Sequence, residues 1–371
     1  MATQYGGATA KSSATSAAET RNHLVFVDGF RAVAIVAIVV GHCFQLSFDS
    51  AVGEPSSADF LLNIITGNTT LFVFISGLLF HHVFYKNWNY GRFMVSKLQK
   101  VFIPYAICCL FLLAWVNLKG ATPYTHTHHA LGVVQNVYTD YAFSLVSGQL
   151  GLSLWYIPFV AIIFIASPLF VKFIELSPKQ RAKLLVVALA IGLLVNRSPH
   201  NVDKLQNLAY FVFYYLLGIE VSLRREVITN WLSRRETFVF LALLLGIVSY
   251  IEFTWQGLLG TYGSWFHYHE PNVHYFQKII LIFFCCAFLI QFPSFNQGRM
   301  KSLADDSFGI FFTHNLVIAM LSSVLGNGVV VTGYKFLDLG LYGIIVLALS
   351  WLIVVTIKKR AGRDSRMLIG S

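Results

Sequence analysis

Charged residues are scarce in this sequence. Asp, Glu, Lys and Arg make up 12% of its 371 residues, about half the fraction usual for a soluble globular chain. Hydrophobic residues make up 56% and aromatic residues 15%, and a soluble domain cannot bury that much apolar surface. The apolar residues run in blocks of about twenty, the length that a helix needs to cross a hydrocarbon core of about 30 Å. The composition therefore predicts a polytopic membrane protein.

Cysteine is also rare, and its placement excludes the usual cysteine sites. None of the five cysteines has the spacing of a metal knuckle or a redox pair. All fall inside apolar blocks, where we expect buried free thiols: Cys43, Cys108, Cys109, Cys285 and Cys286.

The basic excess has no nucleic-acid pattern. The net charge is +10, but the bases form short clusters between the apolar blocks rather than a stripe or tail with interleaved aromatics. Residues 1–22 are rich in Ala, Ser and Thr, without the apolar stretch of a signal peptide, and we expect a disordered cytoplasmic tail. We find no internal repeat and predict one transmembrane domain over residues 23–357, followed by a basic cytoplasmic tail over 358–371.

The apolar blocks predict an all-α bundle of about ten transmembrane helices. The expected spans are 27–47, 62–84, 101–118, 152–173, 184–197, 207–223, 237–256, 275–292, 307–325 and 337–357. Arg31 lies within the first span. With the N-terminus in the cytoplasm, twenty-one of the other Lys and Arg residues fall inside and five fall outside or at the outer edge. The positive-inside rule therefore predicts that both termini are cytoplasmic, in a multi-pass protein of the cell (inner) membrane.

Two long connections, 119–151 and 257–274, then face outward. They are rich in His, Tyr, Thr, Gly and Asn and suit a neutral polyhydroxylated ligand, although a plain solvated loop has the same composition. Zinc binding by their histidines would need further ligands to converge, and a fortuitous polar cluster is the simpler interpretation of His126, His128, His129, His267, His269 and His274. We expect no bound metal.

Arg31 and His42 flank ten mostly aliphatic residues in the first span. Such groups within a membrane helix usually face a partner or a water-filled cavity. Eleven positions place both on one helix face about 16 Å apart, so a single cavity can hold both. In the alternative interpretation, Arg31 snorkels to the headgroups and His42 bonds a neighbouring helix. Asp28, one turn before Arg31, can pair with it in either case.

Two acidic residues lie within later spans. Glu220 precedes Arg224 by one turn, which favours an edge ion pair over a position facing the cavity. Glu252 has no basic neighbour at helical spacing, so it remains a candidate for acceptor binding.

Several motifs together resemble the acyltransferase 3 family of membrane acyltransferases. The first helix of that family carries an Arg and a His separated by ten residues after an Asp-Gly pair, as in DGFRAVAIVAIVVGH here. The motifs that follow, in the family's order, are LFVFISGLLF with Ser76 and Gly77, KLQKVFIPY with Lys97 and Lys100, SLWYIPF with Trp155, and SFGIFFTHNLVI with His314. The basic pair is commonly Arg in the family and is Lys here, without the bidentate fork of Arg.

The resemblance implies transfer of an acyl group, most often acetyl, from acyl-coenzyme A to a hydroxyl of a glycan. Acetyl-coenzyme A is then a donor substrate, and no permanently bound cofactor is expected. Lys97 and Lys100 would hold the donor at the cytoplasmic mouth, although ordinary positive-inside anchoring explains them equally well. Arg31 would stabilise the oxyanion, and His42 would serve as general base or accept the acyl group transiently.

The expected acceptors are exopolysaccharide or lipid-linked repeat units, because the sequence shows no fused extracytoplasmic catalytic domain. Expected partners are the bilayer, the carbohydrate and the polysaccharide synthesis machinery. A glycan or small-molecule transporter, or flippase, is the main alternative, and the lack of repeated halves counts against it. A catalytically silent partner of a synthase is a third possibility, which the presence of both Arg31 and His42 disfavours.

Overall fold

The computed structural model describes residues 27–44, 57–120, 123, 132–255, 265–266, 272–326 and 331–371. Most of these residues are helical, and the only extended pairing among them is an isolated bridge between Val195 and Phe266. The expected all-α class is therefore confirmed. The first helix covers residues 27–42. The N-terminal tail and five of the six loop histidines, all but His274, lie outside the described residues.

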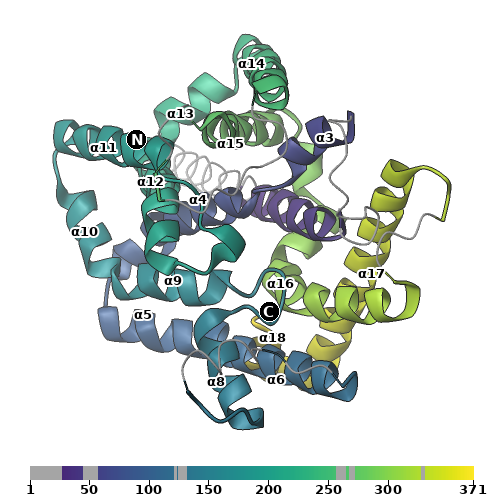
Figure 1. Cartoon of the computed structure of the whole chain (residues 1–371). Coiled ribbons are helices and arrows are strands. Elements are labelled where there is room, and N and C mark those ends of the chain that lie inside the picture. Colours follow the sequence, from purple (N-terminus) through teal and green to yellow (C-terminus); the bar gives the residue numbers. More distant parts are fainter. Residues whose placement is uncertain are drawn as a thin grey trace, which may run out of the picture.

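The remaining helices form a bundle around α4, as Figure 1 shows. The first half contains α3 (Ser57–Ile65), α4 (Thr69–Leu79), η1 (Phe80–Phe84), η2 (Tyr85–Asn87), α5 (Tyr90–Lys97), η3 (Leu98–Phe102), α6 (Ile103–Leu118), α8 (Val137–Ser147), α9 (Tyr156–Ile165), α10 (Ser167–Glu175) and α11 (Pro178–Leu194). The second half contains η4 (Pro199–Asn201), α12 (Lys204–Leu223), α13 (Arg225–Leu232), α14 (Arg235–Trp255), α15 (Val273–Gln291), η5 (Pro293–Asn296), α16 (Arg299–Leu325), α17 (Lys335–Ala361), η6 (Gly362–Asp364) and α18 (Ser365–Ile369).

Six stretches of helix are long and apolar enough to cross a membrane: Phe60–Asn87, Tyr90–Leu118, Arg235–Trp255, Val273–Gln291, Arg299–Leu325 and Phe336–Ile369. The pair α9 and α10 adds a seventh if counted as one span, bent by 54°. The bend falls just before Pro168, where the missing N–H and the ring interrupt the helical ladder. Helices also occupy the other predicted spans, but the described residues support six or seven by length and composition, and ten stays a prediction.

Two glycines bring α4 and α12 into backbone contact. A Cβ on Gly77 would lie 2.0 Å from the carbonyl oxygen of Tyr215, and a Cβ on Gly218 would lie 2.0 Å from that of Phe74. Small residues permit such close approach between membrane helices, where dispersion contacts rather than hydrophobic burial hold the helices together. Gly77, singled out from the sequence as part of a Ser-Gly pair, is therefore a packing residue at the centre of the bundle.

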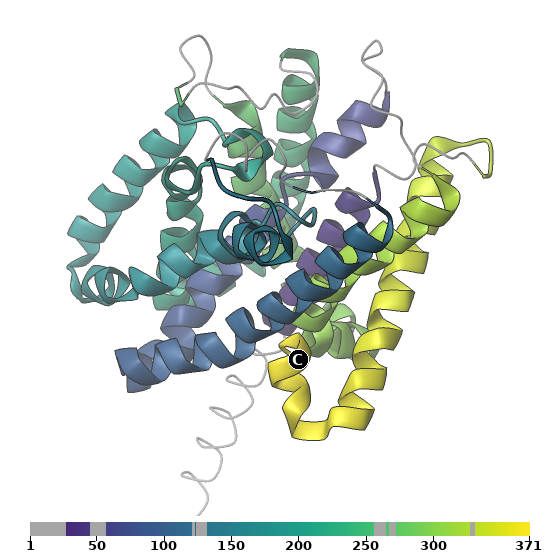
Figure 2. The ribbon, with the colours of Figure 1, turned by 60° about the horizontal axis from the view of Figure 1, so that its bottom comes forward.

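The first helix and α16 run in the same direction. Arg31 donates to Ser307 over 3.2 Å near the start of both helices, and His42 lies 3.1 Å from His314 further along both. The chain then descends through α17 and turns back through η6 into α18 (Figure 2). There Gly370 packs between the carbonyl of Lys100 and the ring of Phe308. The start of α6, the start of α16 and the end of the described chain thus meet at one end of the bundle, here called the Arg31 end.

Candidate active site

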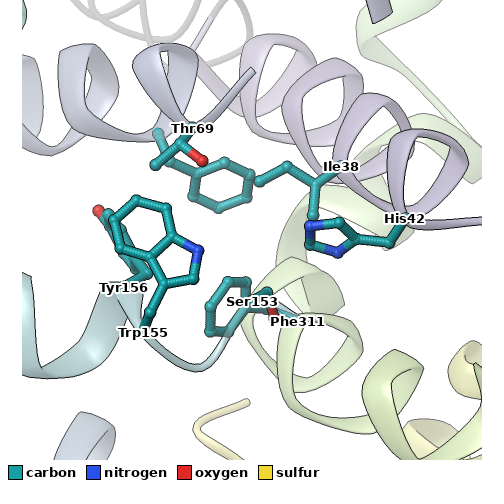
Figure 3. Close-up of a pocket in the computed structure, with 8 residues that line it drawn as sticks. Ile38, His42, Thr69, Ser153, Trp155, Tyr156 and Phe311 are labelled. Atoms are coloured by element: carbon teal, nitrogen blue, oxygen red, sulfur yellow. The ribbon is translucent and has the colours of Figure 1, made fainter. Parts of the chain in front are cut away.

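A small pocket lies between four parts of the chain that are far apart in the sequence. About 230 Å³ of non-atom space lies there, part of it open to the surroundings. The first helix, the start of α4, the turn before α9 and α16 supply its lining (Figure 3), which consists of Ile38, His42, Thr69, Phe72, Ser153, Trp155, Tyr156 and Phe311. The space that these side chains leave free has room for about one water molecule. The pocket therefore does not hold a whole sugar or nucleotide in this conformation.

His42 and His314 form a stacked, hydrogen-bonded pair beside this pocket. Their rings are 5.3 Å apart and nearly parallel, at 8°, and His42 Nδ1 lies 3.1 Å from His314 Nε2. His314 Nδ1 lies 2.9 Å from the carbonyl oxygen of Ile310, one turn earlier on α16. His314 has no exposed surface.

These contacts define the tautomer of each neutral imidazole. A carbonyl only accepts hydrogen bonds, so His314 Nδ1 carries a proton and its Nε2 is an acceptor. His42 Nδ1 must then be the donor to His314, which leaves the lone pair of His42 on Nε2. In Figure 3 the His42 ring points into the pocket, and the indole nitrogen of Trp155 faces it from the other side. The pocket therefore contains a free imidazole base and an N–H donor.

Hydrogen bonds from neighbouring helices hold the pocket wall. Ser76 on α4 lies 3.4 Å from the hydroxyl of Tyr156. Asn315 donates to Ser153 Oγ over 2.7 Å and accepts from the Ser153 backbone N–H over 3.2 Å. The turn that presents Ser153 and Trp155 to His42 is therefore tied to α16, the helix that carries His314.

Arg31 lies outside this pocket. Besides Ser307 it contacts Asp28, at 3.8 Å, and its side chain is 28% exposed. The sequence places Arg31 and His42 on one helix, but the structure brings only His42 to the pocket lining. Three helical turns, about 16 Å, separate the two residues along the axis. Arg31 therefore lies at the end of the first helix that is far from the pocket. Its expected role in stabilising the oxyanion stays a prediction.

Lys97 and Lys100 have different surroundings. The ammonium of Lys97 lies over three aromatic rings, 4.2 Å from the centroid of Phe84, 4.8 Å from Phe164 and 5.1 Å from Phe93. Such cation–π contacts stabilise the charge within the protein. Lys100 is exposed. Of the two, only Lys100 offers its charge directly to a soluble ligand.

Glu252 has partners that sequence spacing does not reveal. Its carboxylate lies 2.7 Å from His274 Nδ1 on α15, and only 1% of the residue is exposed. Lys278, one turn further along α15, interacts electrostatically with Glu252 and donates to the carbonyls of Asn63 and Ile64 at the end of α3. Lys278 is fully buried. The charge count placed Lys278 at the outer edge, but it stabilises a helix C-terminus inside the protein. The acceptor role of Glu252 stays a prediction.

The ion pair expected for Glu220 is confirmed. Its carboxylate binds Arg224 at helical spacing, and it also binds Arg181 on α11 over 2.8 Å. Glu220 therefore ties the start of α11 to the end of α12. Within the described part of the chain, no group of three or more His, Cys, Asp or Glu residues is arranged to hold a metal ion.

Seven pocket and support residues were not singled out from the sequence: Ile38, Thr69, Phe72, Ser153, Tyr156, Phe311 and Asn315. One signal was present, because Thr313, His314 and Asn315 form a polar triplet in the middle of an otherwise apolar segment. Polar groups inside the bilayer are costly and usually serve a function. The aromatic residues gave no such signal, since aromatic side chains occur throughout the chain.

The fold and pocket define a polytopic membrane protein with a histidine base enclosed between its helices. The family model described as an acyltransferase domain matches residues 24–355, nearly the whole chain. The chain belongs to the acyltransferase 3 family and is a membrane acyltransferase. Comparison with curated proteins and with solved structures gives no match.

Proposed function

We propose that the protein transfers an acyl group, most simply acetyl, from cytoplasmic acyl-coenzyme A to a hydroxyl of a glycan. The observation that carries the proposal is the hydrogen-bonded series from His42 through His314 to the Ile310 carbonyl, which leaves His42 Nε2 free in the pocket. A base oriented by a second group is the usual device for activating a hydroxyl. Mass spectrometry of cell-surface glycans with and without the protein tests the proposal, because acylation should disappear with it.

In the proposed step, the acceptor oxygen attacks the thioester carbonyl as His42 Nε2 takes its proton. The tetrahedral intermediate then collapses, the C–S bond breaks, and the coenzyme A thiolate leaves and is protonated. His314 accepts the hydrogen bond from His42 throughout and stabilises the imidazolium that forms. The Trp155 indole N–H, on the opposite side of the pocket, is placed to donate to the developing oxyanion.

A transient acyl group on His42 is the alternative to general-base catalysis. Both mechanisms use the same nitrogen, but only one leaves a covalent intermediate. Intact-protein mass spectrometry after incubation with acetyl-coenzyme A, in the absence of acceptor, distinguishes them. We propose the base mechanism and expect no mass increase that depends on His42.

The donor end of the protein is proposed to be the Arg31 end. Arg31 and Ser307 lie there. Gly370 packs against the ring of Phe308, the residue after Ser307, and against the backbone carbonyl of Lys100. The partly exposed Arg31 guanidinium and the exposed Lys100 ammonium can both bind phosphate. The pantetheine arm then spans the three turns from Arg31 to His42. Lys97 supports this end through its aromatic contacts.

Donor affinity should depend on Arg31 and Lys100. Arg31→Ala and Lys100→Ala should each weaken acetyl-coenzyme A binding by about fivefold to tenfold, the usual effect of losing one charge-assisted phosphate contact. High salt should weaken binding of the unmodified protein. Lys97→Met is the matched control, since it fills the aromatic site without charge. If only Lys97→Met weakens binding, the phosphates lie elsewhere. If the protein binds no acetyl-coenzyme A, the proposed donor is wrong and the transporter alternative is favoured.

The membrane orientation follows from the charge distribution. We propose that the Arg31 end is cytoplasmic and that the His42 end lies toward the outer face, with both chain termini inside and ten spans in the inner membrane. The parallel course of the first helix and α16 agrees with this, because the first and ninth of ten spans must cross in the same direction. The glycan can then stay outside while the acyl group crosses.

Reporter fusions test this orientation. A reporter joined after Arg366 should be active only in its cytoplasmic form, and one inserted near His128 only in its extracytoplasmic form. The prediction rests on the distribution of Lys and Arg residues, with twenty-one on the cytoplasmic side and five on the outer side. The reverse pattern would place the donor end outside and overturn the proposed reaction geometry.

The proposed acceptors are exopolysaccharide or lipid-linked repeat units in contact with the synthesis machinery. The pocket is too small to enclose a sugar ring with its neighbours, so only the reacting hydroxyl is expected to enter. The rest of the glycan would contact the loops around the His42 end.

A further inference from the structure

The segment between α11 and α12 places a cation against the wall of the His42 pocket. The guanidinium carbon of Arg197 lies 5.2 Å from the centroid of the Trp155 ring and 5.8 Å from that of Phe211. The charge of Arg197 also acts electrostatically on His42 and on the buried His274. Arg197 thus contacts Trp155, a residue of the pocket wall.

Arg197 has no carboxylate partner in the described part of the chain. Its one side-chain hydrogen bond runs from Nε to the Asn201 side-chain oxygen, over 2.8 Å. The side chain is deeply embedded in the protein, yet it keeps some accessible surface. Its charge interacts electrostatically with His42, His274, Lys278 and Tyr210. None of these is a carboxylate. An embedded cation without an anion is costly, and a ligand of opposite charge would offset that cost.

A strained turn holds this cation in place. His200 and Asn201 both have left-handed backbones, with φ of 48° and 57°, a conformation that residues other than glycine rarely adopt. The carbonyl of His200 accepts from Gln149, and that of Asn201 accepts from Lys204, each over 2.8 Å. Strain of this kind persists where surrounding contacts impose it, often at ligand sites.

The same segment meets a second connection of the chain. Asn196 donates from its backbone to the Trp265 carbonyl over 2.9 Å, and Val195 pairs with Phe266. Residues 265 and 266 belong to the connection 257–274, which the sequence predicts to face outward. A glycan approaching His42 from this side would therefore pass Arg197 before its hydroxyl reaches the pocket.

We propose that Arg197 binds an anionic group of the acceptor, a carboxylate or a phosphate carried by the glycan, and so selects acidic over neutral sugars. The planar guanidinium fork matches either anion. A hydroxyl of the bound glycan would then enter the His42 pocket. This inference rests on the proposed function, in which the acceptor is a carbohydrate.

Three soluble probes test the inference with purified protein in lipid nanodiscs: methyl β-glucoside, methyl β-glucuronide and glucose 6-phosphate. Binding of each is measured without donor, by saturation-transfer NMR titration. At least one acidic probe should bind about tenfold or more tightly than the glucoside, as one charge-assisted contact allows. Whichever acidic probe binds better identifies carboxylate or phosphate as the natural anion. Raising salt from about 0.05 to about 0.5 M should reduce the preference.

Substitutions then assign the preference to Arg197. Arg197→Gln and Arg197→Met should abolish it while changing glucoside binding little, and Arg197→Lys, which keeps the charge without the planar fork, should weaken the preference but not abolish it. Equal binding of all three probes by the unmodified protein, or a preference that survives in Arg197→Met, would overturn the inference. If the variants do not fold, the salt titration of the unmodified protein is the test: a preference for the acidic probe that does not fall with salt would overturn the inference. If the preference holds but acetyl-coenzyme A acylates no probe, the proposed function fails and the anion site stands.

Discussion

His42→Ala should reduce acyl transfer by about 10²- to 10⁴-fold, the usual cost of losing a proton-transfer catalyst. The reason is that His42 Nε2 is the free base in the pocket, because His42 Nδ1 is hydrogen-bonded to His314. The loss should appear in kcat, measured as coenzyme A release from purified protein. Acetyl-coenzyme A binding should be unchanged, since the donor phosphates are proposed to bind three turns away.

His314 provides the matched comparison for this experiment. His314→Ala keeps the base but removes the acceptor that fixes its tautomer, so kcat should fall by about tenfold or more while remaining above that of His42→Ala. The pair would have a packing role alone if His42→Gln, which retains much of the side-chain volume, transferred acyl groups at the full rate. Full activity of Arg31→Lys alongside it would also remove the catalytic role expected for Arg31.

Gly77→Ala should have a comparably large effect on folding. A Cβ at this position would collide with the Tyr215 backbone, and neither main chain can move away without separating α4 from α12. Overpacking in a well-packed core costs about 1–3 kcal/mol or more, and here the clash is with backbone. We expect a large loss of folded protein, measured as the monodisperse fraction after detergent extraction and as a lower thermal transition.

Ser76→Ala is the control, since it changes the adjacent residue and removes only the contact with Tyr156. It should keep the yield and thermal transition of the unmodified protein and lower transfer modestly. A normal yield of Gly77→Ala would mean that the backbones of α4 and α12 are not in contact at this position. The two residues of the Ser-Gly pair thus have separate roles, one at the pocket wall and one in helix packing.

The sequence predicted the membrane class and the positions of the helices well, because both follow from local composition and length. It was weakest where a helix is surrounded by protein rather than lipid. The helix α12 contains buried polar residues such as Gln206, Asn207 and Glu220. Its sequence is therefore less hydrophobic than that of a helix that faces lipid. The helix α11 is short, at 17 residues. These two segments, the first helix and the bent α9 and α10 are the predicted spans that fall outside the six supported by length and composition in the described residues.

The candidate site was predictable only as single residues. Periodicity within one helix shows neighbours at three or four positions, as it did for Asp28 with Arg31 and for Glu220 with Arg224. It carries no information about contacts between helices. The pairing of His42 with His314, of Glu252 with His274 and of Arg197 with Trp155 depends on packing between distant segments. Arg197 was counted only as one of the outward bases.

The stacked histidines also set the order in which the enzyme matures during synthesis. Their positions differ by 272 residues, so His42 enters the membrane long before the ribosome has made α16. Until then His42 lacks the partner that fixes its tautomer, and the pocket lacks Phe311. A nascent chain therefore has no complete pocket until α16 has been made.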